Sequence, residues 1–196
     1  MLKKSAFPAN FRIVTLCGSK GALQAYIQVL RILPEQNGMA FVVMTHRRAE
    51  RSCQLVKILS SVTSMPVQEI KNGATLLPNH VYVVPPGKDL TTDGIVFRLS
   101  PISTLYGWPD AFNIFLKSVA RNTRGRAVTV ILSGLADDGS AALAGLRTSG
   151  GVSFAQADAL EISMPTSAVA TGNIDYFCSA VDIATLVSSL PVLSLS

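Results

Sequence analysis

Residues that bind metals or form disulfides are scarce in this sequence. Its 196 residues include three cysteines, Cys17, Cys53 and Cys178, and two histidines, His46 and His80. The cysteines are odd in number, widely separated and without a C-x-x-C pair, which excludes a disulfide scaffold and a clustered zinc site. We therefore expect no bound metal and no disulfide framework.

Long apolar runs are also absent. No run reaches the roughly 18 residues that a membrane-spanning helix needs. The N-terminal stretch MLKKSAFPANFR has two lysines but lacks the long apolar segment of a secretory signal peptide. The expectation is a cytoplasmic protein that does not insert into a membrane.

Charged residues are few, at 15% of the chain, whereas apolar residues make up 48%. This balance excludes a disordered chain and predicts one compact globular domain with a sizeable core. The formal net charge is +5, and basic residues gather at Lys20, Arg47, Arg48 and Arg51. Such a cluster would suit an acidic substrate or partner, or it is simply a solvated face. No nucleic-acid partner is expected.

Apolar segments of strand and helix type alternate along the chain. Strands are expected at 12–17, 39–45, 66–70, 127–132 and 152–156, and helices at 20–33, 49–61, 109–119, 141–146 and 182–190. Because the strands are continuously apolar, they predict a doubly wound, mostly parallel α/β sheet of Rossmann-like type with helices on both faces. Runs at 81–84 and 95–99, separated by turn residues, predict one antiparallel β-hairpin. We expect an N-terminal extension at 1–11, one domain at 12–190 and a tail at 191–196.

Three chemically distinctive residues lie just beyond the carboxyl ends of predicted strands. Ser19, His46 and Asp138 each follow a different strand, so a parallel sheet can bring them to one edge. A serine becomes a nucleophile when an oriented base takes its proton, and these are the three residue types required. Taken singly, Ser19 suits a helix N-cap, His46 a silent strand-end histidine, and Asp138 a turn or cap residue.

The stretch TLCGSKGAL at 15–23 also raises the question of a phosphate-binding loop. It lacks both G-x-G-x-x-G and G-x-x-x-x-G-K-[ST], and it is not the G-x-S-x-G elbow of an esterase. Free N–H groups at the start of the following helix would suit an oxyanion beside Ser19. A nucleotide-binding protein is therefore the weakest of the functional interpretations.

Five segments match, in order, the motif pattern of one known family. They are LCGSKGA at 16–22, MTHRR at 44–48, NGATLLPNHVYVVP at 72–85, LSGLADDGS at 132–140, and the block from AQ at 155–156 to SMPTSA at 163–168. The chain thus resembles the C-terminal catalytic domain of chemotaxis protein-glutamate methylesterases, the CheB family. The resemblance implies that Ser19 is the nucleophile, His46 the general base and Asp138, rather than Asp137, the third member of the triad. It also implies an oxyanion cleft at Lys20, Gly21 and Leu135, and no cofactor.

The resemblance implies a serine hydrolase that removes methyl groups from, and in related members deamidates, glutamyl side chains of a methyl-accepting chemotaxis receptor. Arg47, Arg48 and Arg51 would help to bind an acidic helical segment of that receptor. Because the family's receiver domain has no counterpart in this sequence, a separate receiver or kinase protein is a further expected partner.

The sequence departs from the family pattern at three places. Lys20 follows the nucleophile, Arg47 and Arg48 replace a Met-Pro pair after His46, and Asp89 stands where the hairpin usually has a histidine. Lys20 would either stabilise negative charge or block the ester. The alternative function is therefore a weakly active or inactive methylesterase-like domain that docks a signalling partner.

Overall fold

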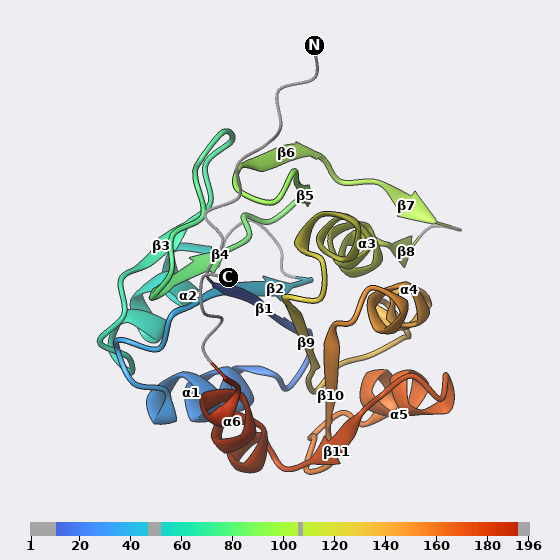
Figure 1. Cartoon of the computed structure of the whole chain (residues 1–196). Coiled ribbons are helices and arrows are strands. Elements are labelled where there is room, and N and C mark those ends of the chain that lie inside the picture. Colours follow the sequence, from blue (N-terminus) through green and yellow to red (C-terminus); the bar gives the residue numbers. More distant parts are fainter. Residues whose placement is uncertain (1–10, 47–51, 106–107, 192–196) are drawn as a thin grey trace.

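The computed structural model describes residues 11–46, 52–105 and 108–191. Within these ranges, seven parallel strands form one sheet (Figure 1). The strands are β1 Arg12–Gly18, β2 Met39–Thr45, β3 Val67–Glu69, β4 His80–Val83, β9 Ala127–Ile131, β10 Val152–Gln156 and β11 Tyr176–Cys178. The α-helices are α1 Leu23–Ile32, α2 Ser52–Ser60, α3 Ala111–Thr123, α4 Leu143–Thr148, α5 Ser163–Ala170 and α6 Ala180–Ser189.

Helices cover both faces of this sheet, because side chains alternate between the faces along each strand. In β1, Val14 and Leu16 pack into the core with α1, α2 and α6. Ile13 and Cys17 point the other way, into the core with α3, α4 and α5. Figure 1 shows α1 and α6 on one side of the sheet and α3 and α4 on the other. The predicted doubly wound parallel fold is confirmed.

The strand order places β1 at the centre. It runs β11-β10-β9-β1-β2-β4-β3, with Arg12 opposite Met39 of β2 and Ile13 opposite Ala127 of β9. The chain leaves β1 towards β2 and returns on its other side as β9. Ligands of such sheets bind where the order reverses, beyond the carboxyl ends of the strands. This edge is where Ser19, His46 and Asp138 follow their strands.

The predicted pairing of 81–84 with 95–99 was wrong, although an antiparallel hairpin is present. β4 lies in the central sheet, parallel to β2 and β3. The hairpin instead joins β5, Lys88–Thr92, to β6, Phe97–Pro101. The Asp93-Gly94 turn links these two, and the positive φ of Gly94, 107°, explains the glycine. β4 is buried on both faces, as a central parallel strand requires.

Several smaller elements differ from the sequence expectation. The strand at 152–156 is not the last, because α5 and the three-residue edge strand β11 follow it. A second antiparallel pair, β7 Thr104–Leu105 with β8 Trp108–Pro109, precedes α3. Pro109 therefore ends β8 rather than opening the helix, and Asp110 is the N-cap.

None of the helices in the described ranges is long and apolar enough to cross a membrane. Most of the expected N-terminal extension and C-terminal tail lies outside the described residues, so the boundaries at 12 and 190 stay predictions.

Two phenylalanines on neighbouring strands test how the sheet is stabilised. Phe154 of β10 is fully buried, whereas Phe177 of β11 is 56% exposed. We expect Phe154→Ala to lower the free energy of unfolding by about 3–5 kcal/mol through the cavity it leaves. Phe177→Ala should cost less than about 1 kcal/mol, because the side chain already contacts water. Urea unfolding measures both, and equal losses would contradict the packing described.

Candidate functional site

Ser19 lies in a tight turn between β1 and α1. The turn brings the backbone of Gly18 so close to α1 that an added Cβ would lie 2.5 Å from Ala22 Cβ and 2.6 Å from the Tyr26 hydroxyl oxygen. Gly21 has φ of +79°, a conformation that other residues rarely adopt. The two glycines that flank Ser19 are therefore required by the turn itself, and they bring Ser19 out at the sheet edge.

Ser133, at the end of β9, ties this turn to two other segments. Its carbonyl oxygen accepts a hydrogen bond from the N–H of Ser19 at 2.9 Å. Its hydroxyl donates to the Lys20 carbonyl and accepts from the N–H of Glu161, both at 2.9 Å. Its own N–H donates to Gln156 Oε1 at 3.0 Å. With 1% of its surface exposed, Ser133 has each of its polar groups paired and holds the Ser19 turn in place.

The loop after Ser133 reaches the Ser19 side chain directly. The N–H of Leu135 donates to Ser19 Oγ at 3.0 Å. Gly134 permits this approach, since an added Cβ would lie 2.7 Å from Ser19 Oγ and 2.6 Å from Met164 Cε. Ala136 has φ of +66°, which is strained for a residue with a side chain. A backbone donor is thus held against the serine oxygen by a constrained loop.

Asp138 lies against the N-terminus of α3. Its Oδ2 accepts from the N–H of Phe112 and its Oδ1 from the N–H of Asn113, both at 3.0 Å. These are two of the amides that a helix start leaves without an internal partner, and a helix N-terminus favours negative charge. The side chain of the N-cap Asp110 makes no capping hydrogen bond. Asp138, 5% exposed, therefore caps α3 from a distant loop.

His46 is fixed between Asp138 and Phe112. Its Nε2 lies 2.8 Å from Asp138 Oδ2, and its ring stacks on Phe112 with centroids 4.2 Å apart and planes 10° apart. Nε2 is therefore committed to the carboxylate, and Nδ1 is the ring nitrogen left for another partner. In the described part of the chain, Ser19 Oγ is bonded to Leu135 rather than to His46.

Ser19, His46 and Asp138 line one cleft of about 670 Å³, as their positions after three strands predict. The other residues that line it are Lys20, Pro109, Asp110, Asn113, Lys117, Leu135, Ala136, Asp137 and Ala141. Of the three residues expected at an oxyanion cleft, Lys20 and Leu135 line this cleft, whereas Gly21 is not among its lining residues and faces Ser133 and Leu160. No group of three or more His, Cys, Asp or Glu side chains in the described ranges could hold a metal ion.

Lys20 lines the cleft but does not bury its charge. Its Nζ lies 2.6 Å from Glu161 Oε1, and 67% of its side chain is exposed. The ammonium group is thus neutralised by a carboxylate of the loop before α5. Arg47, Arg48 and Arg51, expected to bind substrate, lie outside the described residues.

Cys17 lies beneath the site but is not available for chemistry. Burial raises the pKa of its thiol well above the usual range, and the nearby charge of Asp138 raises it further. A buried thiol that stays protonated is not a nucleophile.

The comparisons with known proteins show the family of the chain. The family model described as CheB methylesterase matches residues 14–187. The chain belongs to the CheB methylesterase family.

Three curated relatives carry the name protein-glutamate methylesterase/protein-glutamine glutaminase. The relatives from Bordetella pertussis, Nitratidesulfovibrio vulgaris and Myxococcus xanthus are 27%, 31% and 32% identical to this chain, over 92%, 88% and 82% of it respectively. The matches cover 53%, 48% and 46% of those proteins, so the chain spans about half the length of the curated relatives it matches.

The CheB fold is also found in a solved structure. The crystal structure of the Thermotoga maritima CheB methylesterase catalytic domain has a TM-score of 0.86 and 24% identity, covering 92% of this chain and 98% of that one.

Three contributions to the site were not predicted. The position of Ser133 in the LSGLADDGS segment could have indicated that it belongs to the site. Only the fold shows that it joins its own loop to the Ser19 turn and to the loop that carries Glu161. Phe112 was predicted as a core residue of a helix, not as the surface on which His46 stacks. Glu161, the partner of Lys20, had no sequence signal, since exposed loop carboxylates are common.

The role of Ser133 can be tested against a matched serine. Ser133→Ala leaves the Lys20 carbonyl and the Glu161 N–H without their partner, which should lower the free energy of unfolding by about 1–3 kcal/mol. Hydrogen exchange at the Ser19 amide should accelerate. Ser153, also 1% exposed, donates through Oγ to the Asn173 carbonyl away from the cleft. Ser153→Ala should destabilise the fold similarly without selective exchange at Ser19, and the same response in both variants would contradict the assignment.

Proposed function

We propose that this domain is a protein-glutamate methylesterase that hydrolyses γ-glutamyl methyl esters on a chemotaxis receptor. The observation that carries the proposal is the 2.8 Å contact between His46 Nε2 and Asp138 Oδ2, in the same cleft as Ser19. Family membership, established over residues 14–187, supports the same reaction class.

In the proposed first step, Ser19 Oγ attacks the ester carbonyl and its proton passes to His46 Nδ1. Asp138 holds the ring through Nε2 and stabilises the imidazolium that forms. The N–H of Leu135, which donates to Ser19 Oγ in the free protein, is then a donor for the negative oxygen of the tetrahedral intermediate. No metal or cofactor takes part.

The intermediate collapses when methanol leaves with the proton from His46, and Ser19 is left acylated. Water, deprotonated by His46, attacks this acyl group and releases the glutamate carboxylate and the Ser19 hydroxyl. The same sequence on a glutamine amide releases ammonia in place of methanol, which matches the second activity in the relatives' names.

The proposed substrate is an acidic helical segment of a methyl-accepting receptor. The Lys117 ammonium group at the cleft and the formal net charge of +5 favour such a surface, whereas the charge of Lys20 is already paired with Glu161. Arg47, Arg48 and Arg51 are proposed to extend this surface. The proposal includes a cytoplasmic location and regulation by a separate receiver or kinase protein.

The triad is tested by three substitutions in the described loops. Ser19→Ala and Asp138→Asn should each lower kcat/KM for a methylated receptor fragment by about 10³-fold or more. Asp137→Asn is the matched control, because Asp137 is exposed and next in sequence; its effect should stay below about threefold. Methanol release measures turnover.

Circular dichroism and unfolding midpoints confirm that each variant is folded at the assay temperature. If the wild-type protein turns over no methylated receptor or model ester, the proposed activity is wrong and the docking-module alternative stands. If Asp137→Asn is as damaging as Asp138→Asn, the assignment of the acid is wrong.

Lys20 is tested because it could either assist or block the reaction. Its charge is paired with Glu161 and exposed, and exposed ion pairs contribute little, so Lys20→Met should lower kcat/KM by less than about fivefold. Arg31→Met is the control, since Arg31 lies in the last turn of α1, at the opposite edge of the sheet. Initial rates at low and high salt give kcat/KM for both variants. A loss of about 100-fold would make Lys20 part of the oxyanion site, and a clear gain in rate would show that it blocks the ester.

A further inference from the structure

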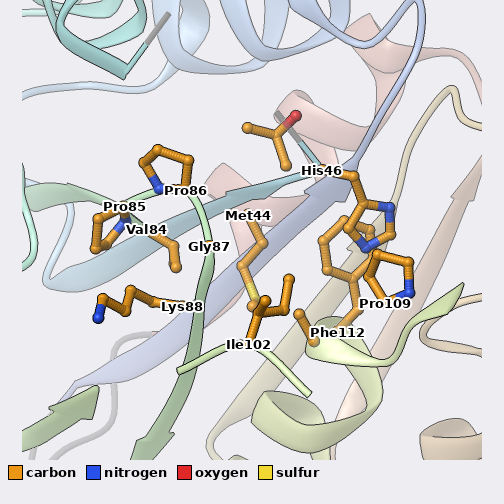
Figure 2. Close-up of a pocket in the computed structure, with 12 residues that line it drawn as sticks. Met44, His46, Val84, Pro85, Pro86, Gly87, Lys88, Ile102, Pro109 and Phe112 are labelled. Carbon is orange, nitrogen blue, oxygen red and sulfur yellow. The ribbon is translucent and has the colours of Figure 1, made fainter. Parts of the chain in front are cut away.

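A second, smaller cavity of about 200 Å³ lies beside the candidate active site. His46 and Pro109 line both cavities, so the two are neighbours that share a wall. Figure 2 shows this cavity between the Pro85–Lys88 loop and the wall formed by His46, Phe112 and Pro109, with Met44 between them. Nothing in the triad mechanism uses this cavity.

The walls of this cavity are mostly apolar, and prolines restrict their backbone. Pro85, Pro86 and Pro109 restrict their own backbone, and φ of +69° at Gly87 turns the chain between β4 and β5. The N–H of Ile102 donates to the Gly87 carbonyl at 3.1 Å. This hydrogen bond holds the segment that carries Ile102 against the Gly87 turn. The cavity is therefore formed before any ligand arrives.

The floor of the cavity is part of the core between the sheet and α3, α4 and α5. Met44 and Phe112 are each 1% exposed and Val84 is 8% exposed. Lys88 directs its ammonium group away from Met44 (Figure 2). A ligand in this cavity would thus meet mostly carbon and sulfur, together with the His46 ring and the buried Thr45 hydroxyl.

Asp89 explains how the Ile102 wall is held. It is 4% exposed, and its Oδ2 accepts from both the N–H and the hydroxyl of Ser103, at 2.9 and 2.6 Å. Because Ser103 follows Ile102, this carboxylate fixes the segment that carries the wall. Asp89 is also the position at which the sequence departs from the histidine expected from the family pattern.

We propose that the cavity binds one apolar side chain of the polypeptide whose glutamyl ester lies at Ser19. This inference rests on the proposed function, and it adds a specificity pocket to it. Because His46 and Pro109 line both cavities, a chain that occupies the cleft lies next to this cavity. At about 200 Å³ it is smaller than the roughly 300–1,000 Å³ of pockets that hold whole small molecules, but it accommodates a side chain of leucine or methionine size.

A helical substrate would place such a side chain three or four residues from the ester. Residues at this spacing lie on the same face of a helix, one turn apart, as the neighbouring cavities require. The enzyme should therefore distinguish receptor sites by the apolar residue one turn from the modified glutamate.

The test uses helical peptides of about 20 residues that carry one glutamyl methyl ester, a length at which isolated helices can form. Leucine or serine is placed in turn at each position three or four residues before or after the ester. The wild-type protein should favour leucine over serine about tenfold in kcat/KM at one of these positions, the scale on which one apolar group changes pocket specificity. In Ile102→Asp this leucine-to-serine ratio should fall to about one.

Leu77→Asp is the matched control, because Leu77 is 47% exposed, compared with 40% for Ile102, and does not line the cavity. It should keep the wild-type ratio. The ratio is internal to each variant, so a general loss of activity does not change it. The pocket is overturned if the wild-type protein shows no preference at any position, or if Ile102→Asp keeps the preference.

A binding measurement tests the pocket independently of the proposed esterase activity. Calorimetry with the same peptides, carrying glutamine in place of the ester, measures affinity for the Ser19→Ala protein. Leucine selectivity that Ile102→Asp removes, without any turnover by the wild-type protein, would support the pocket and overturn the esterase. Turnover without selectivity in either measurement would support the esterase and overturn the pocket.

Discussion

The rest of the site depends on the hydrogen bonds that the Asp138 carboxylate accepts. It accepts the N–H groups of Phe112 and Asn113 at the start of α3 and also binds His46 Nε2. Because α3 packs its apolar face into the core beside the sheet, the carboxylate links a buried helix to the imidazole. The stacking of Phe112 on His46 comes from the same helix turn. One buried charge thus fixes the helix start, the ring orientation and the choice of ring nitrogen.

Much of this arrangement could be predicted from the sequence, for identifiable physical reasons. Continuous apolar runs such as 39–45 and 127–132 predict parallel strands, and parallel strands place the residues that follow them at one edge. That logic brought Ser19, His46 and Asp138 together before any contact was known. The family resemblance then separated Asp138 from Asp137, and burial explains the difference, since Asp138 is 5% exposed and Asp137 is exposed.

The remainder depends on contacts between distant segments. The run at 81–84 looked like one arm of a hairpin because its neighbours are turn residues, yet β4 is buried between β2 and β3. β11 has three residues, a run too short for its apolar sequence to mark it as a strand. The hydrogen bonds of Ser133 to Lys20 and Glu161 join residues that no local pattern connects.

The hydrogen bonds divide the site into two blocks. Ser133 joins Ser19 to the loop that carries Glu161, and the N–H of Leu135 belongs to the same block. His46, Asp138 and the start of α3 form the other block. In the described chain, the two blocks meet on one loop, because Leu135 contacts Ser19 Oγ and Asp138, three residues later, contacts His46 Nε2. Under the proposed function, a substrate in the cleft would touch both blocks at once, and its binding energy would act as the crosslink that aligns the serine with the imidazole.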